Sequence, residues 1–224
     1  ITHDLSTPLQ IISGYVEMVE DGEVTLTPER LNIIKTEIEH LRRLVGDLTT
    51  ISQAEGGMLE IQKAPEDPAQ LLGAIYQAYE PIVSKQGVSL ILDAQPNQAL
   101  INVDEGRFIQ ILKNLVDNAL RYTPAGGSIT LSSRVGDQVE IRVADSGSGI
   151  EPKDLPYVFD RFYQADQART GNKGKMGLGL AICKALAKAQ GCQIRAESAG
   201  RGLGTTMIIT TPKYHTPETK PKNL

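Results

Sequence analysis

Residues 114–124 read Asn114-Leu115-Val116-Asp117-Asn118-Ala119-Leu120-Arg121-Tyr122-Thr123-Pro124. Apolar residues in and before this stretch recur at helical spacing, which predicts a helix over about 104–122. Asn114 and Asn118 are four residues apart, so they share one helix face. Asparagine is unfavourable inside helices, and two on one face indicate a site for a hard cation such as Mg²⁺, with Arg121 placed to contact a phosphate. Two solvent-exposed amides are the alternative.

Two glycine-containing segments follow this helix. A strand is predicted over 139–144, and Asp145-Ser146-Gly147-Ser148-Gly149-Ile150 comes directly after it. The glycines let backbone approach a ligand closely, and Asp145 is placed to accept a hydrogen bond from an exocyclic amine. Gly174-Lys175-Met176-Gly177-Leu178-Gly179-Leu180 opens a helix predicted over 177–190, whose free N–H groups would bind an anion. Neither segment is a dinucleotide fingerprint or a P-loop, and ordinary loops are the alternative.

The elements around these segments predict a mixed α and β domain. We expect helices over 68–85, 104–122 and 177–190, and strands over 89–93, 127–134, 138–144, 193–197 and 205–211. Residues 65–68 are interpreted as a linker that leads into a helix. Helices alternating with strands, together with an adjacent hairpin, predict an α/β sandwich with a mixed sheet.

The N-terminal part has a different pattern, typical of two amphipathic helices. The first helix places Leu5, Leu9, Ile12, Val16 and Val19 on one stripe. The second, opened by Thr27 and Pro28, carries a heptad seam of Leu31, Ile34, Ile38, Leu41, Val45, Leu48 and Ser52. An antiparallel hairpin that dimerises into a four-helix bundle would bury this seam. A hairpin packed on the rest of its own chain is the alternative.

His3 stands at the start of this hairpin, in Thr2-His3-Asp4-Leu5-Ser6-Thr7-Pro8-Leu9. The carboxylate of Asp4 would keep one imidazole nitrogen protonated and leave the other as a nucleophile. Thr7 lies four residues on and shares the face of His3, and Pro8 is expected to kink the helix. An ordinary surface histidine is the alternative.

Composition excludes several classes of protein. The chain has 224 residues and a net charge of −4, without a basic run, which argues against nucleic acid as a partner. Hydrophobic residues make up 40%, which excludes wholesale disorder. No apolar run approaches the ~18 residues of a membrane span, and no signal peptide is recognisable. Cys183 and Cys192 are expected to be buried apolar residues in a reducing cytoplasmic setting. Because the sequence starts at Ile1, we expect it to be a fragment of a longer protein. That longer protein is compatible with a membrane anchor outside this fragment.

The order of these motifs resembles the transmitter region of two-component sensor histidine kinases over nearly the whole chain. Residues 3–9 resemble the phosphoacceptor box, 114–124 the N box, and 145–150 the first glycine box. Val158-Phe159-Asp160-Arg161-Phe162-Tyr163 resembles the aromatic F box. Residues 177–182 resemble the second glycine box and 202–205 the third.

The resemblance implies a dimerising phosphoacceptor hairpin over 1–60 and a Bergerat-type ATP-binding domain over 61–214. Residues 215–224 have little apolar content and are expected to form a disordered tail. His3 would take the γ-phosphoryl group of ATP, Asp4 would orient its imidazole, and Thr7 would serve dephosphorylation of the partner. Asn118 would hold Mg²⁺, beside Asn114 and Arg121, and Asp145 would bind the adenine amine. The implied partners are a second copy, bound through 1–60, and a response-regulator receiver domain, bound near Tyr15, Glu17, Met18 and Glu20. The other residues implied for ATP are Tyr122, Gly147, Gly149, Lys175, Gly177, Leu178, Gly179 and Thr205.

Two departures from the family pattern keep other functions open. Ser6 stands where the family usually has a basic residue, and Lys175-Met176 where it usually has a glycine followed by a small residue. A phosphatase-biased or scaffold module that binds ATP poorly is therefore one alternative. Another ATPase of the same fold is a second, but that class carries a glutamate base at the position of Asn114. A serine/threonine kinase of the anti-sigma type is a third, and it lacks the hairpin. Phosphoryl transfer would require the two domains to swing about residues 57–66.

Overall fold

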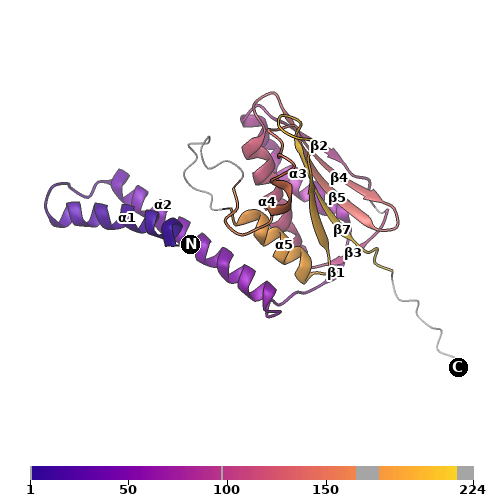
Figure 1. Ribbon diagram of the computed structural model, residues 1–224, viewed down its shortest axis with the longest axis horizontal. Coiled ribbons are helices and arrows are strands. Elements are labelled where there is room, and N and C mark those ends of the chain that lie inside the picture. The colour runs from indigo at the N-terminus through magenta and orange to yellow at the C-terminus, as the bar shows by residue number, and fades with distance from the viewer. Residues whose placement is uncertain (1, 97, 165–176, 216–224) are drawn as a thin grey trace.

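The computed structural model describes residues 2–96, 98–164 and 177–215, with side chains from residue 6 onward (Figure 1). Its elements follow the order α1 (Thr2–Glu20), α2 (Pro28–Glu55), β1 (Ala64–Glu66), α3 (Pro68–Lys85), β2 (Ser89–Asp93), β3 (Ile101–Val103), α4 (Glu105–Tyr122), β4 (Ser128–Val135), β5 (Val139–Asp145), the 3₁₀ turn η1 (Leu155–Tyr157), α5 (Gly179–Ala189), β6 (Gln193–Glu197) and β7 (Thr205–Thr211). A helical hairpin is therefore followed by an α/β domain, as predicted.

The hairpin forms because the sequence ends α1 and starts α2 within a few residues. Gly22 adopts a left-handed φ of 71° after α1, a conformation that glycine tolerates without strain. The hydroxyl of Thr27 then accepts a hydrogen bond from the Arg30 N–H at 3.4 Å, and Pro28 occupies the first turn of α2. Both features are those of a well-defined helix start.

The apolar residues of α2 are divided between two faces. Leu44 and Ile51 are only 4% and 1% exposed and belong to the main core cluster, because the last part of α2 packs against α5. Leu9 and Val16 of the α1 stripe and Leu31, Ile38 and Val45 of the α2 seam stay 39–57% exposed in the single chain, whereas the seam residues Leu41 and Leu48 pack against the core cluster. The hairpin thus packs on its own chain at one end and leaves part of the predicted seam uncovered.

The sheet of the second domain is mixed, as predicted. Its strand order is β2-β4-β5-β7-β6; β2 is parallel to β4 and the other pairs are antiparallel. Helices α3, α4 and α5 lie on one face (Figure 1). Between them and the sheet lies an apolar, mostly aliphatic core in which Phe108, Ile111, Leu115, Ile141 and Ile209 are at most 1% exposed.

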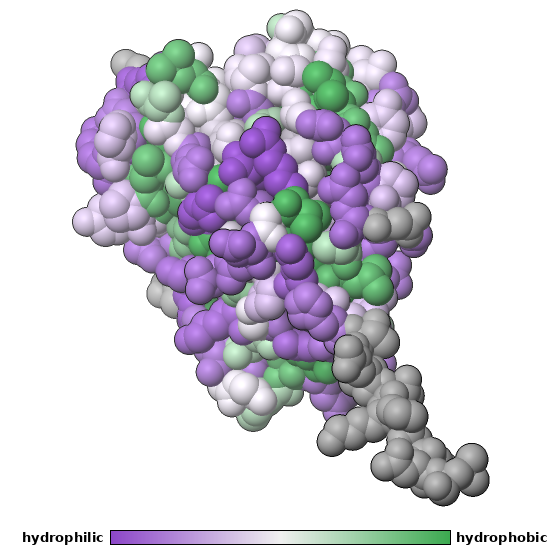
Figure 2. Space-filling model, turned by 90° about the vertical axis from the view of Figure 1, so that its right-hand side faces the viewer, coloured by the Kyte–Doolittle hydropathy of each residue, from purple (hydrophilic) through white to green (hydrophobic). Residues whose placement is uncertain are grey.

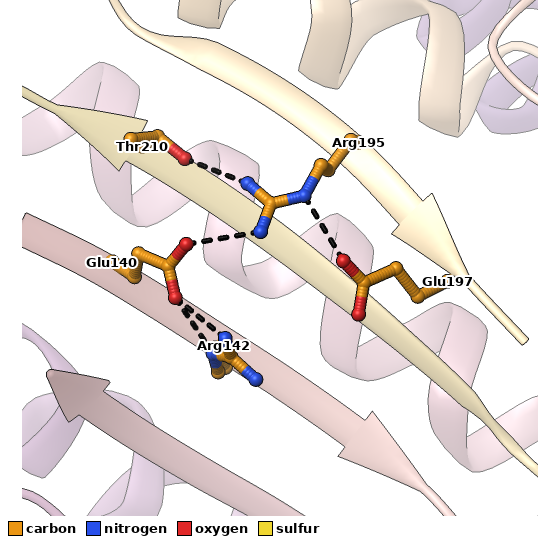
Figure 3. Close-up of polar contacts among 5 residues, drawn as sticks. All are labelled: Glu140, Arg142, Arg195, Glu197 and Thr210. Atoms are coloured by element: carbon orange, nitrogen blue, oxygen red, sulfur yellow. Dashed lines mark hydrogen bonds and ion pairs between the residues drawn. The ribbon is translucent and has the colours of Figure 1, made fainter.

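The opposite face of the sheet carries a charged network (Figure 3). Arg195 on β6 donates to Glu140 on β5 at 2.9 Å, to Glu197 at 3.1 Å and to Thr210 on β7 at 3.0 Å. Ile208 lies on this face in register with Arg142 and Arg195 and yet is fully buried, because the aliphatic stems of arginines cover neighbouring apolar surface. Figure 2 shows hydrophilic residues prevailing on the side it views.

Two short strands were missed in the sequence. The sequence predicts a linker over 65–68, but β1 pairs antiparallel with β3 in the register Ala64↔Val103. Three-residue strands carry no recognisable alternation, and Pro65 argued against a strand. Asp104 is the N-cap of α4 rather than its first residue, because its carboxylate accepts from the Arg107 N–H at 3.0 Å.

The connection between hairpin and domain is shorter than the predicted pivot of 57–66. The N–H groups of Met58 and Leu59 bond back to the Gln53 carbonyl of α2 at 2.8 and 3.1 Å. From the other side, the Gln62 N–H donates to the Asp104 carboxylate at 2.9 Å. Gln190, 2% exposed, accepts both from the Asp104 N–H at 2.8 Å and, through its carbonyl, from Lys63 Nζ at 2.5 Å. Only Glu60 and Ile61 lie between these two sets of bonds.

Within the described ranges, no helix combines the length and apolarity needed to cross a membrane. Cys183 and Cys192 are free and buried, as predicted. Burial raises the pKa of the Cys183 thiol to about 12, so this group is inert rather than nucleophilic.

Candidate functional site

The sequence motifs of the second domain converge where β5 ends, β7 begins and α4 ends. The Ser148 N–H donates to the Tyr122 carbonyl at the end of α4, at 3.1 Å. The N–H of Thr205, the first residue of β7, donates to Asp145 Oδ1 at 3.2 Å. Helix α5 packs beside α4, where the side chain of Asn114 hydrogen-bonds Cys183. One end of the domain therefore holds all three motifs.

Asp145 has one carboxylate oxygen committed to the protein. Oδ1 accepts from the Gly147 N–H at 2.9 Å and from the Thr205 N–H at 3.2 Å. Among the described residues these are the bonds it receives, and they leave Oδ2 for a ligand. Burial raises the pKa of this carboxyl against the lowering effect of the two N–H groups. A rigid, partly desolvated acceptor suits recognition of an amine.

The glycines beside Asp145 are required by backbone-to-backbone contact. A Cβ on Gly147 would lie 2.3 Å from the Tyr122 carbonyl oxygen, and one on Gly149 would lie 2.0 Å from that of Gly200. A Cβ on Gly204 would lie 2.0 Å from the Asp145 oxygen. These glycines therefore admit neighbouring loops and the end of α4, Gly149 does so at a positive φ of 65°, and their close approach to a ligand stays a prediction.

The face of α4 that carries the two asparagines is half-buried. Asn114 and Asn118 are both of intermediate exposure. Arg121 has a buried Nε without a hydrogen-bond partner in the described part of the chain, and its guanidinium lies 5.5 Å from the Tyr122 ring centroid. On another face, Asp117 accepts from the Tyr79 hydroxyl at 2.9 Å and fixes α4 against α3. An unpaired guanidinium nitrogen beside two amides suits an anionic ligand that carries a cation.

The start of α5 presents main-chain N–H groups without a side-chain cap. Leu178 is the N-cap residue and makes no capping bond; its side chain is 3% exposed, so only its backbone can serve a ligand. Gly177, with a φ of 65°, would place a Cβ 2.5 Å from the Tyr163 oxygen, and its carbonyl accepts from the Phe162 N–H at 3.1 Å. Phe162 itself adopts a φ of 65°, which is strained for a bulky residue. The F box thus packs on the start of α5, whose main-chain N–H groups no side chain caps.

Several predicted residues are not placed in full. The backbone of His3 and Asp4 belongs to α1, but their side chains lie outside the described atoms, and Lys175 lies within 165–176, outside the described residues. Thr7 is exposed on α1, and Pro8 next to it is buried. Thr205 is only 8% exposed and contributes its N–H to Asp145.

Sequence reasoning missed two serines of this site. Ser146 Oγ accepts from the Ser128 N–H at 2.8 Å, and Ser198 Oγ accepts from the Ile150 N–H at 2.9 Å. Their partners are main-chain atoms distant in the sequence, so spacing carries no signal of them. The position of Ser198 directly after a strand and before Gly200 was the only available hint.

The donor set fits Mg²⁺ only together with a ligand. Among the described residues, no group of three or more His, Cys, Asp or Glu side chains could hold a metal ion. Mg²⁺ takes oxygen ligands and commonly keeps water and substrate phosphates in its shell. The single amide oxygen of Asn118 fits that mode and does not fit a metal site made of protein alone.

Two family descriptions match the chain. Residues 103–215 match the family "Histidine kinase-, DNA gyrase B-, and HSP90-like ATPase". Residues 1–57 match the "His Kinase A (phospho-acceptor) domain". The first match covers the α4, β5, α5 and β7 elements that build the site.

Named relatives and solved structures agree with these matches. The chain is 34% identical over 218 residues to the sensor histidine kinase WalK of Bacillus subtilis, covering 95% of this chain and 35% of WalK. It is 34% identical over 213 residues to the signal transduction histidine-protein kinase BaeS of Escherichia coli, covering 95% of this chain and 45% of BaeS. The chain thus spans less than half the length of these relatives.

Among solved structures, the Acinetobacter baumannii histidine kinase AdeS has a TM-score of 0.78 at 26% identity, covering 95% of this chain and 98% of AdeS. Full-length ShkA, in complex with AMPPNP, has a TM-score of 0.72 at 28% identity, covering 96% of this chain and 45% of ShkA. The chain has a phosphoacceptor hairpin followed by a Bergerat-type domain with a mixed sheet. It belongs to the two-component sensor histidine kinases and corresponds to their transmitter region.

Proposed function

We propose that the chain binds ATP with Mg²⁺ and transfers the γ-phosphoryl group to His3. One observation carries this proposal: Asp145, the Asn114–Asn118 face of α4 and the uncapped start of α5 converge at one end of a domain that is tethered to the His3 hairpin. ShkA, which shares the fold, was solved with the ATP analogue AMPPNP. The family membership of the chain supports the same reaction.

Each part of the site has a distinct task. Asp145 Oδ2 accepts from the adenine amine, with Tyr122, Gly147, Gly149 and Thr205 around it. The N–H groups at Gly177, Leu178 and Gly179, together with Arg121 and Lys175, neutralise phosphate charge. Asn118, beside Asn114, would hold Mg²⁺, which supplies charge neutralisation when it is bound. Phosphoryl transfer depends mainly on such positioning and electrostatics.

His3 is the acceptor in this proposal. An imidazole titrates near neutrality, so a useful fraction is the neutral nucleophile at pH 7, and the Asp4 carboxylate orients its second nitrogen. The new bond joins an imidazole nitrogen to the γ-phosphorus while the bond to the β,γ-bridging oxygen breaks and ADP leaves. Asn114 is not a carboxylate and cannot act as a base for water, which disfavours plain ATP hydrolysis.

Two partners follow from this chemistry. The exposed seam of α1 and α2 supports a second copy of the chain, bound through residues 1–60 as a four-helix bundle. Phosphohistidine is a good phosphoryl donor, and we propose an aspartate of a receiver domain as the acceptor, bound near Tyr15, Glu17, Met18 and Glu20.

The test is incubation with γ-labelled ATP and Mg²⁺, followed by assay of acid-labile, base-stable label. Label is expected on the wild-type chain and on His215→Gln, an exposed histidine far from the phosphoacceptor box, and none on His3→Gln. Label that persists in His3→Gln would contradict the assignment of His3. A wild-type chain that binds no adenine nucleotide would contradict the ATP site itself.

A phosphatase-biased module is a second candidate, favoured by Ser6 and Lys175-Met176. Thr7 is exposed on α1, which supports a contact with a bound receiver. Absent label together with tight binding of a fluorescent nucleotide, and Thr7-dependent loss of phosphate from a phosphorylated receiver, would support this candidate over the kinase.

A further inference from the structure

The hydroxyl of Ser198 lies between two loops beside Asp145. Its Oγ accepts a hydrogen bond from the Ile150 N–H at 2.9 Å, across 48 residues of sequence. The same Oγ donates to the carbonyl oxygen of Gly204 at 2.7 Å; because a hydroxyl has one proton, the Gly200 oxygen at 3.5 Å is the lesser acceptor. One side chain therefore joins the end of the 146–150 loop to the end of the 199–204 loop.

These two loops are in direct backbone contact. The Gly202 N–H donates to the Ser148 carbonyl at 2.7 Å and the Gly204 N–H to the Gly147 carbonyl at 3.1 Å. There is no room at the contact, since a Cβ on Gly149 would lie 2.0 Å from the Gly200 oxygen and 3.2 Å from Ser198 Oγ. A displacement of the 199–204 loop is therefore passed on to its neighbour.

Asp145 depends on both loops. It accepts from Gly147 in the first at 2.9 Å and from Thr205, directly after the second, at 3.2 Å. If the second loop moves, Thr205 moves with it, and one of the two bonds that orient the carboxylate is lost. The start of α5, where the phosphates are proposed to bind, has no bond to Ser198 among the described residues.

We infer that Ser198 is a positioning residue for the nucleobase: its hydroxyl fixes the 199–204 loop on the 146–150 loop and thereby keeps Asp145 aimed at the base. The inference rests on the proposed ATP site. Removing the hydroxyl leaves the Ile150 N–H and the Gly204 carbonyl without their partner, which costs more than the absence of a bond alone. The loss of the hydroxyl is expected to weaken discrimination between nucleobases and to leave phosphate binding unchanged.

The experiment compares Ser198→Thr with Ser198→Val in the whole chain. The two side chains have nearly the same shape, so any disturbance from the added methyl is common to both, and only threonine keeps the hydroxyl. Dissociation constants for ADP and for GDP are measured by titration calorimetry. Ser198→Val is expected to bind ADP about tenfold more weakly than Ser198→Thr, with affinity for GDP changed less than twofold. Ser198→Ala should follow Ser198→Val, and Ser133→Ala on β4 should match wild type.

Each result is decisive. Equal ADP affinity of the threonine and valine variants would overturn the inference and leave the ATP site in place. Loss of ADP and GDP affinity by the same factor would also overturn it, because general loss of structure has that signature. A wild-type chain that binds neither nucleotide would overturn the ATP site and, with it, this inference.

Discussion

Asp145 has a stability cost that its proposed function explains. Its carboxylate is partly desolvated, and burial raises its pKa above the usual value for aspartate. The folded chain therefore binds a proton more readily than the unfolded chain, and stability falls as pH rises through this range. At neutral pH the carboxylate is charged, so the full cost of burying that charge lowers the stability of the fold. Such a cost is expected for a residue that is retained because it binds a ligand.

Asp145→Asn should separate stability from binding. The amide oxygen can still accept from Gly147 and Thr205 but carries no charge to desolvate, so the ligand-free variant should melt at a higher temperature than wild type at pH 7. This difference should shrink as the pH falls and vanish well below the ordinary pKa of an aspartate, where the position is uncharged in both chains, folded and unfolded. Its affinity for ADP should fall at least about tenfold, because charge-assisted hydrogen bonds are the stronger ones. A lower melting temperature at pH 7 would contradict this account.

The local sequence pattern around each site residue decided whether its role could be predicted. Asp145, Asn114 and Asn118 were recognisable because each stands at a strand end or on a helix face set by local periodicity. Ser198 and Gln190, the C-cap residue of α5, were not, because their partners are backbone atoms brought close only by the fold. Leu178 is predicted to contact ATP; its side chain is buried in the core, so that prediction concerns its backbone N–H alone.

The loop between β5 and η1 tolerates no side chain at its second glycine. Gly149→Ala would place a Cβ 2.0 Å from the Gly200 oxygen at a φ of 65°, and we expect a loss of at least about 2 kcal/mol in the free energy of unfolding. Gly73→Ala is the matched control: it lies within α3 with nothing within 4 Å of the new Cβ and should stabilise by about 0.5–1 kcal/mol. Urea unfolding of both variants tests the pair, and equal midpoints would contradict it.

The exposed seam of the hairpin should control oligomeric state. Ile38 is 39% exposed in the single chain, and a charge at this position would be buried in the proposed dimer. Ile38→Lys should raise the dimer dissociation constant at least about a hundredfold, whereas Glu39→Lys, on the exposed outer face, should change it little. Sedimentation equilibrium measures both, and an unchanged dimer in Ile38→Lys would exclude this seam as the interface.

Helices and the longer strands were predictable because their signals are local. Asp67 followed by Pro68 marked the start of α3, and Asp67 indeed caps it by accepting from the Ala69 N–H at 2.9 Å. Strands β1 and β3 escaped prediction because each has three residues and exists only through pairing with the other. The heptad pattern of α2 identified the seam, but Leu44 and Ile51 repeat every seven residues on another face, and sequence alone does not say which face meets α5.

In the whole molecule, the end of α2 holds the two domains together. Leu44 and Ile51 are buried there, and Glu55 forms an ion pair with Arg161 of the F box. Both charged groups are about half exposed, so the pair itself contributes little. The burial of Leu44 and Ile51 therefore contributes most of the free energy that holds the two domains together.

Ile51→Asp should release the hairpin from α5. The lost burial is worth about 2–5 kcal/mol, so the radius of gyration from small-angle X-ray scattering should increase while ADP affinity is retained. Thr49→Asp, on the exposed face of the same helix, is the control and should scatter as wild type. Identical scattering from all three chains would show that this contact does not set the arrangement.

The linker contacts also determine the kinetic order of the proposed reaction. With Leu59 bonded to α2 and Gln62 to Asp104, the tether between the hairpin and the second domain spans at most about 10 Å. So short a tether gives the proposed nucleotide-binding domain a high effective concentration near the hairpin of its own chain. The same domain of a separate chain free in solution does not reach that concentration. The initial rate of His3 labelling should therefore be strictly proportional to chain concentration wherever the dimer persists, and added His3→Gln chains should compete only by exchanging into dimers.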